Sequence, residues 1–350
     1  MSPDAKAPLV SRASMSQVSS ANGMPFIRYF LAFSLIATHF CVLADKPLVW
    51  PIIGDHVVKS FFVIAGFYAT YSYLRSGNLM TYAKKRFLRT YPLYFCVVAL
   101  CTVFGWVFST LSLGEYFTSG QTLRYFLSNV CFLNFVEPSL PGVFTENFTS
   151  AVNPSLWFMK VLVMFYAVVP LMVWLMRRLG KWPVLLLFLV VGIAYREVCL
   201  YLYESTGIQS YATWSHQLPG QLPYFLAGMA VILYFDVFCR YWRPVLTGGM
   251  LLGLALTYIE SRPLSYLWPL VYAVFIIGIA YFLRPLPSLR RYPDITYGLY
   301  LIHAPVVQAY LQCLPDTEPL LLFGMVVVTT VILAYVGWRQ EKKVSGKKLV

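Results

Sequence analysis

The chain has 350 residues, of which 59% are hydrophobic and only 12% carry a charged side chain. A soluble domain has roughly a quarter charged residues, so this composition excludes a soluble domain and intrinsic disorder. The same composition excludes a secreted disulfide scaffold. The seven cysteines include no CxxC pair, which disfavours a zinc ribbon or a thioredoxin-like site, and we expect no metal site. The mean hydropathy of +0.66 predicts an all-α, polytopic membrane helix bundle. At about 20 residues per span, about ten transmembrane helices fit.

Residues 1–23 are rich in Ser, Ala and Pro and lack a continuous apolar core, which predicts a mobile cytoplasmic tail rather than a signal peptide. Residues 24–338 form the predicted transmembrane domain, and the basic segment 339–350 predicts a second cytoplasmic tail. The apolar runs that predict the ten spans are 25–43, 57–74, 91–112, 155–176, 183–203, 219–238, 244–259, 265–283, 294–313 and 319–338.

With 27 Lys and Arg residues against 14 Asp and Glu, the net charge is +13, but the basic residues gather in short clusters between apolar runs. With the N-terminus inside, 20 of them fall on inner segments and 4 on outer segments. This asymmetry follows the positive-inside rule and predicts that both termini are cytoplasmic. The sequence has no basic domain and no nucleic-acid motif, so we expect no nucleic-acid partner.

The longest outer connection is predicted at 113–154. Its middle part, 122–135, is apolar enough to form a helix. We expect that helix to be re-entrant or to lie at the membrane interface rather than to be part of a loose loop.

Two ionisable residues lie inside the first predicted span, where such groups are costly and therefore functional candidates. Arg28 and His39 are eleven residues apart. On a helix this is about 16 Å along the axis and close to three turns, so both side chains face the same side. A cation near the inner end and a base deeper in the bilayer suit a long anionic substrate. The structural alternative is that Arg28 reaches the inner headgroups and His39 bonds a neighbouring helix.

A basic cluster precedes the third predicted span and contains Lys84, Lys85, Arg86 and Arg89. Arg86 and Arg89 are at positions i and i+3 and share a helix face, and two neighbouring guanidinium groups suit phosphate oxygens. The alternative is an ordinary positive flank on the inner side. In the preceding span, Gly66 predicts close packing between two helices.

Five patterns occur in a fixed order along the chain. They are Arg28-x10-His39, Phe61-Phe62-x3-Gly66-Phe67, Lys85-Arg86-x2-Arg89-x2-Pro92, Ser155-Leu156-Trp157-Phe158 with Phe165-Tyr166, and Thr296-Tyr297-x2-Tyr300-Leu301-Ile302-His303-x-Pro305. This set resembles the membrane acyltransferase-3 family and covers about residues 24–338.

The resemblance implies an integral-membrane O-acyltransferase that moves an acyl group, usually acetyl from cytoplasmic acetyl-CoA, to hydroxyls of glycans or lipid-linked sugars. It implies that His39 is the catalytic residue and that Arg86, Arg89 and Arg28 bind the acyl-CoA donor. No cofactor is implied beyond this co-substrate. The implied partners are the donor, the sugar acceptor and the lipid bilayer, and the implied location is a bacterial inner membrane, with several passes.

Two positions depart from the family pattern. Ala65 stands where a Ser usually precedes Gly66. The acidic residue that often follows the fourth-span Trp is replaced by Leu162 or Val163, and Lys160 adds a cation nearby.

The mechanism that follows from the resemblance keeps the CoA phosphates at the inner face on the three arginines. The pantetheine arm then delivers the thioester near His39, which removes the proton of the acceptor hydroxyl as general base. Tyr68 and Trp157 are candidate donors to the oxyanion. The candidates for positioning the substrate are Trp157, Tyr68, His303 and Lys160. His303 has a structural alternative, in which its side chain only packs between helices.

A transporter or flippase for a glycan or lipid is the competing interpretation, because it would also have many spans and intramembrane charges. The sequence has no internal repeat and no pair of broken helices at matching positions, which disfavours it. The identity of the acceptor, the length of the acyl group, a covalent acyl-enzyme and the oligomeric state stay open at the level of sequence.

Overall fold

The computed structural model describes residues 9–11, 15–18, 23–46, 54–259, 261–283 and 292–344. In these ranges the chain is helical with no strand, and its only β-type pairs are two isolated bridges. The all-α fold predicted from composition is therefore confirmed. Most of the tail predicted at 1–23, and residues 345–350 of the tail predicted at 339–350, lie outside the described residues.

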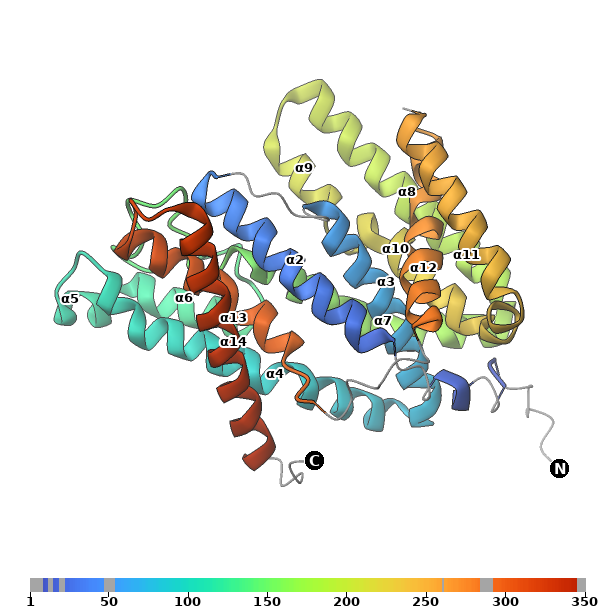
Figure 1. Cartoon of the computed structure of the whole chain (residues 1–350), viewed down its shortest axis with the longest axis horizontal. Coiled ribbons are helices and arrows are strands. Elements are labelled where there is room, and N and C mark those ends of the chain that lie inside the picture. The colour runs from blue at the N-terminus through green and yellow to red at the C-terminus, as the bar shows by residue number, and fades with distance from the viewer. Residues whose placement is uncertain are drawn as a thin grey trace. The chain divides into compact units, whose positions relative to one another are not determined.

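Each of the ten predicted spans coincides with one long helix (Figure 1). These ten are α2 (Met24–Ala44), α3 (Asp55–Ser76), α4 (Leu79–Phe104), α7 (Trp157–Leu179), α8 (Lys181–Thr206), α10 (Leu218–Leu233), α11 (Phe235–Tyr258), α12 (Trp268–Phe282), α13 (Thr296–Cys313) and α14 (Pro319–Val344). The shorter elements are η1 (Gly105–Phe108), α5 (Leu113–Thr118), α6 (Gly120–Val130), η2 (Pro154–Leu156), α9 (Gln209–Ser215) and η3 (Leu264–Leu267).

Not all of these helices are long and apolar enough to cross a bilayer. Within the described ranges seven qualify, namely α2, α3, α4, α7, α8, α12 and α14. The segment before Tyr234 and α11 after it meet at an angle of 108° and count as at most one more span. Helix α13 has only 18 residues and contains His303, Gln308 and Gln312, so its polarity keeps it out of this group. Ten spans and two cytoplasmic termini stay predictions.

The chain divides into two compact units. The first comprises Met1–Ile27, Val58–Lys84 and Val161–Ser288, and it contains most of α3 and α7 with all of α8 to α12. The second comprises Arg28–Val57, Lys85–Lys160 and Leu289–Val350, and it contains most of α2 and α4 with α5, α6, α13 and α14.

In the first unit, α3 and α10 touch through their backbones. A Cβ added at Gly66 would collide with the carbonyl oxygen of Phe225, and one added at Gly228 would collide with that of Val63. The two glycines therefore face each other's helices reciprocally, as in the close helix crossings that small residues permit in membranes. The close packing predicted from Gly66 is confirmed.

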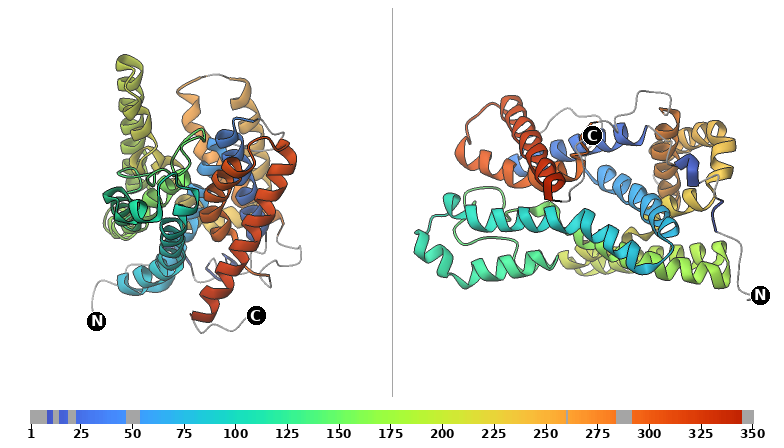
Figure 2. Two further views of the ribbon diagram at one scale, coloured as in Figure 1. Left: turned by 90° about the vertical axis from the view of Figure 1, so that its left-hand side faces the viewer. Right: turned by 90° about the horizontal axis from the view of Figure 1, so that it is seen from below.

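The core of the second unit lies between α2, α13 and α14, which Figures 1 and 2 show side by side. Buried apolar residues of these three helices and of Ile295 form one cluster: Ala32, Ile36, Phe40, Leu43, Ile295, Leu299, Val306, Val307, Leu322, Val326 and Ala334. At about 1.5–3 kcal/mol for each fully buried large side chain, this cluster is the main stabilising contribution to the packing of α2 on α13.

The long connection contains the helix predicted at 122–135, although α6 ends earlier, at Val130. It stops there because Phe132 takes a left-handed φ of 61°, which no helix can continue through. Its buried side consists of Thr122, Tyr125, Ser128 and Asn129, whereas Leu123 on the other side is 60% exposed. An apolar face turned outward fits a lipid-facing surface, and the interfacial position of α6 stays a prediction.

We predict that Gly66→Ala strongly destabilises the protein. The new methyl group would meet a backbone carbonyl, which moves only if α10 moves. Overpacking of this kind costs about 1–3 kcal/mol. Thermal unfolding of the purified protein in detergent should show a lower midpoint, or no folded protein at all.

The matched control is Gly248→Ala in α11, where an added Cβ would meet nothing within 4 Å. Its unfolding midpoint should equal or exceed that of the wild type, since Ala favours a helix over Gly by about 1 kcal/mol. Equal midpoints for Gly66→Ala and Gly248→Ala would contradict the close α3–α10 contact.

Candidate active site

Arg28, at the start of α2, is bound to a carboxylate that precedes α13. Its Nη2 donates to both oxygens of Asp294, at 2.9 and 2.7 Å, and to the hydroxyl of Thr296 at 2.8 Å. Thr296 in turn donates to Asp294 at 2.7 Å. Arg89 of α4 reaches the same carboxylate from its Nη2 at 3.4 Å. Two arginines that are 61 positions apart in sequence thus share one anion.

Asp294 lies before the first residue of α13 and outside the helices that could cross a bilayer. Burial raises the pKa of its carboxyl, but Arg28, Arg89 and the Thr296 hydroxyl together lower it more, to about 2. Since this value is below the ordinary one, the carboxylate stabilises the fold above about pH 4, and that contribution is lost as the pH falls toward the folded pKa. The Asp294 side chain is 45% exposed, so solvent screens the pair.

His39 lies eleven positions after Arg28 on α2 and contacts His303 of α13. The Nδ1 atom of His39 is 3.1 Å from Nε2 of His303 and 3.2 Å from the carbonyl oxygen of Leu35. The two rings have centroids 4.8 Å apart and planes inclined by 59°. His303 is fully buried, whereas His39 is half-buried. Arg28 and His39 therefore both face the segment that contains Asp294 and α13.

The segment before α7 is fastened to α13 by hydrogen bonds. The side chain of Asn153 donates to the carbonyl of Leu301 at 2.8 Å, and the hydroxyl of Tyr300 donates to the carbonyl of Ser155 at 2.7 Å. Two helical turns later, the buried Gln308 donates to the carbonyls of Thr149 and Ala151, at 2.7 and 2.8 Å. These bonds hold η2, and with it the first turn of α7, against α13.

The candidates near the start of α7 occupy different places. Trp157 is half-buried and packs edge-on against Phe158, whose ring is 5.6 Å from that of Tyr300. The ammonium group of Lys160 lies 4.4 Å above the ring of Phe135, so a cation–π contact holds it.

The remaining two candidates are on α3 and α4. Tyr68 lies on α3 in the first unit, and its suggested role at the oxyanion stays a prediction. Arg86 lies one turn before Arg89 on α4, as predicted, but the residue that joins Arg89 at an anion is Arg28.

Sequence reasoning missed Asp294, Asn153 and Gln308. Asp294 stands two residues before the Thr-Tyr pattern of the ninth predicted span, and an acidic residue shortly after the cationic pair Arg290-Arg291 was the available signal. Asn153 and Gln308 gave no comparable signal, because a single amide in a loop or an apolar run has many structural explanations. In the described ranges, no group of three or more His, Cys, Asp or Glu residues could hold a metal ion.

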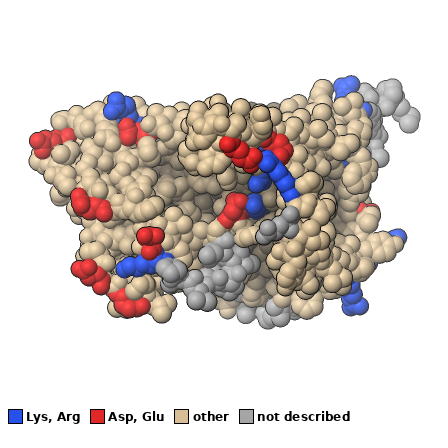
Figure 3. Space-filling view, turned by 90° about the horizontal axis from the view of Figure 1, so that it is seen from above, with Lys and Arg blue, Asp and Glu red and all other residues tan. Residues whose placement is uncertain are grey.

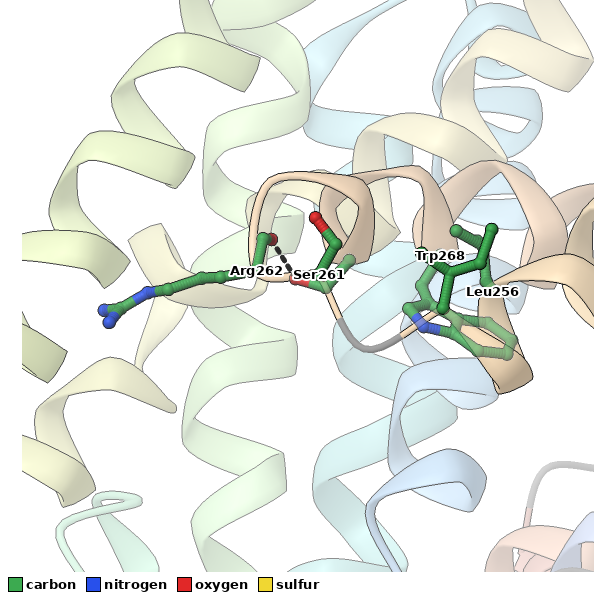
Figure 4. A pocket seen from close by; sticks show the side chains of 6 residues that line it. Leu256, Ser261, Arg262 and Trp268 are labelled. Carbon is green, nitrogen blue, oxygen red and sulfur yellow. Dashed lines mark hydrogen bonds between the residues drawn. The ribbon is translucent and has the colours of Figure 1, made fainter.

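A separate pocket lies at the α11–α12 connection in the first unit, lined by Leu256, Ile259, Ser261, Arg262, Ser265 and Trp268. The Arg262 side chain extends away from Trp268 and Leu256 (Figure 4), toward ion pairs with Glu197 at 2.9 Å and Glu204 at 3.2 Å. Its charge is therefore neutralised outside the pocket. Figure 3 shows a face of the molecule on which such small ionic groups are set in a mostly uncharged surface.

Comparison with known proteins is consistent with the histidine and arginine patterns. Residues 22–339 match the acyltransferase-3 family, which is described as an acyltransferase domain. Nodulation protein 10 of Rhizobium leguminosarum bv. viciae is 24% identical to the chain over 269 residues, 70% of this chain and 70% of that protein. No solved structure matches the chain. Because the match extends over nearly the whole sequence, this protein belongs to the acyltransferase-3 family of membrane acyltransferases.

Proposed function

We propose that this protein is an O-acyltransferase that moves an acetyl group from cytoplasmic acetyl-CoA to a hydroxyl of a cell-surface glycan or of its lipid-linked precursor. The bilayer it occupies would be a bacterial inner membrane. The observation that carries the proposal is the half-buried His39, whose Nδ1 is bonded within the protein, on the same helix as the anion-binding Arg28.

His39 would act as a general base through Nε2. Its lone pair takes the proton of the acceptor hydroxyl while the oxygen attacks the thioester carbonyl. The C–S bond then breaks, and the CoA thiolate leaves and takes up the proton from the imidazolium. Protons and charges balance without a cofactor. A donor such as Trp157, which lies in the same unit as His39, would stabilise the oxyanion.

Arg28 and Arg89 would bind the phosphates of CoA, with Arg86 one turn away on α4. Their guanidinium groups already share the carboxylate of Asp294, so the protein supports an anion between them. The Arg89 side chain is 57% exposed and is accessible to a ligand. Guanidinium groups bind phosphate with paired hydrogen bonds that a Lys ammonium cannot reproduce.

We predict that His39→Ala abolishes acetyl transfer in the folded protein. Loss of a general base costs about 10²–10⁴ in rate. The assay measures transfer of labelled acetyl from acetyl-CoA by purified protein with a membrane glycan extract. The control is His56→Ala, since His56 is exposed at the start of α3 and should retain wild-type turnover. Wild-type turnover by His39→Ala would remove the base from this proposal, and a wild type that neither binds CoA nor transfers acetyl would favour a flippase.

Our second prediction is that Arg89→Lys and Arg86→Lys each weaken CoA binding by about 10-fold or more, which corresponds to about 1.4 kcal/mol. Charge-assisted bonds are worth about 1.5–3 kcal/mol, and Lys keeps the charge but loses the planar fork. Isothermal titration with CoA measures the effect directly. The matched control is Arg75→Lys, an exposed residue at the end of α3 that bonds Tyr71. Equal CoA affinities in all three variants would mean that these arginines only orient the chain in the membrane.

Asp294→Asn gives a third prediction. Without the carboxylate, Arg28 and Arg89 repel each other, and the unfolding midpoint should fall by the equivalent of about 1 kcal/mol for a half-exposed pair. Because CoA phosphate would replace the lost anion, added CoA should raise the midpoint of Asp294→Asn more than that of the wild type. Asp316→Asn, at an exposed position before α14, is the control. A smaller CoA effect in Asp294→Asn than in the wild type would contradict phosphate binding at these arginines.

A further inference from the structure

We propose that His303 is a positioning residue: its Nε2 accepts a hydrogen bond from Nδ1–H of His39 and so holds His39 in the tautomer whose Nε2 is the base. This inference rests on the proposed function in taking His39 as the base. The contact between the two rings carries the argument, and it requires no further ligand.

The protonation of His303 follows from its other contact. Its Nδ1 lies 3.0 Å from the carbonyl oxygen of Leu299, one turn earlier on α13. A carbonyl oxygen only accepts hydrogen bonds, so Nδ1 of His303 must carry the hydrogen. In a neutral imidazole the second nitrogen then has a lone pair. Nε2 of His303 is therefore an acceptor.

The tautomer of His39 follows in turn. Its Nδ1 faces two acceptors, Nε2 of His303 at 3.1 Å and the carbonyl oxygen of Leu35 at 3.2 Å. Both contacts are favourable only if this nitrogen carries the hydrogen, which the two acceptors then share. Nε2 of His39 is left with the lone pair, on a side chain that is half-buried rather than fully enclosed.

This arrangement serves both states of the base. When Nε2 of His39 takes the hydroxyl proton, its Nδ1–H still donates to His303, and no proton has to move between the rings. The role resembles that of the carboxylate in a Ser-His-Asp triad, which fixes the tautomer and orientation of the imidazole. A neutral imidazole does this without placing a negative charge in a fully buried position, where it would be costly.

The same contacts argue against direct hydrogen bonding between His303 and the substrate. Both of its ring nitrogens are engaged, one by Leu299 and the other by His39. The side chain is 0% exposed, so an acceptor sugar could reach it only after displacing His39. The geometry points to an action through His39.

Nitrogen NMR of the purified protein tests the tautomer without any turnover. The chain has only four histidines, so uniform ¹⁵N-histidine labelling gives few signals, and the loss of signals in His39→Gln assigns that residue. We expect Nδ1 of His39 to be protonated and Nε2 to be unprotonated. In His303→Leu, the Nε2–H form of His39 should become populated. A wild-type His39 that carries its hydrogen on Nε2, or a His39 unchanged by His303→Leu, would overturn the proposal.

Kinetics of two variants test the consequence. His303→Leu removes the acceptor, while His303→Gln keeps an acceptor oxygen near the position of Nε2. In the Ser-His-Asp triad, complete loss of tautomer control lowers kcat by about 10⁴. In His303→Leu the Leu35 carbonyl still accepts a hydrogen bond from Nδ1 of His39. We therefore expect a smaller fall in kcat, about 10-fold to 100-fold. The KM values for acetyl-CoA and acceptor should stay near those of the wild type, and His303→Gln should recover most of the lost kcat.

Equal losses in His303→Gln and His303→Leu, with unfolding midpoints near the wild-type value, would overturn the proposal, and so would a change confined to the KM of the acceptor. If His303→Leu does not fold, two measurements still test the proposal: the tautomer of His39 in the wild-type spectrum, and the kcat of His303→Gln relative to wild type. A wild-type protein that transfers no acetyl group would overturn the proposed function, whereas the spectrum would still establish which nitrogen of His39 carries the hydrogen.

Discussion

The polar groups buried on α13 constrain the second unit more than any other feature. In apolar surroundings a buried polar group has to find its partner within the protein, because no water is there to replace it. His303 and Gln308 are both 0% exposed. Each is satisfied by a segment far away in sequence: His303 by α2, and Gln308 by the chain at 149–151. These two contacts fix what must lie against α13.

Apolar packing and polar contacts have different roles along α2. The cluster around Ile36, Phe40 and Leu299 supplies most of the favourable free energy, but apolar surfaces tolerate small shifts of one helix along another. The polar contacts do not. If α2 moved by one turn, about 5.4 Å, both Arg28 and His39 would lose their partners on the α13 segment together. Two polar contacts eleven residues apart therefore set the register in which the candidate base is presented.

The fold was largely predictable because the bilayer imposes a simple pattern on the sequence. Every predicted apolar run became a helix, and the spacing of Arg28 and His39 correctly placed both side chains toward one neighbouring segment. The pattern does not encode angles, so the 108° bend at Tyr234 was not foreseen in a stretch that reads as two ordinary spans. The pattern also does not specify partners: the carboxylate that Arg28 and Arg89 share belongs to Asp294, which tertiary packing brings to them.

The distribution of charge along α2 fits the proposed reaction. The ionised groups Arg28, Arg89 and Asp294 meet where their side chains are 22%, 57% and 45% exposed, so water reduces the cost of their charges. Around His39 the contacts are a second imidazole and a carbonyl, both neutral. An acyl-CoA has the same polarity, with phosphates at one end and an uncharged thioester at the other. One helix could thus present a charged site to the nucleotide end and a neutral base to the reactive end. The imidazolium that forms during transfer would face the negative charge of the oxyanion and then of the departing thiolate, and it would exist only until that thiolate takes the proton.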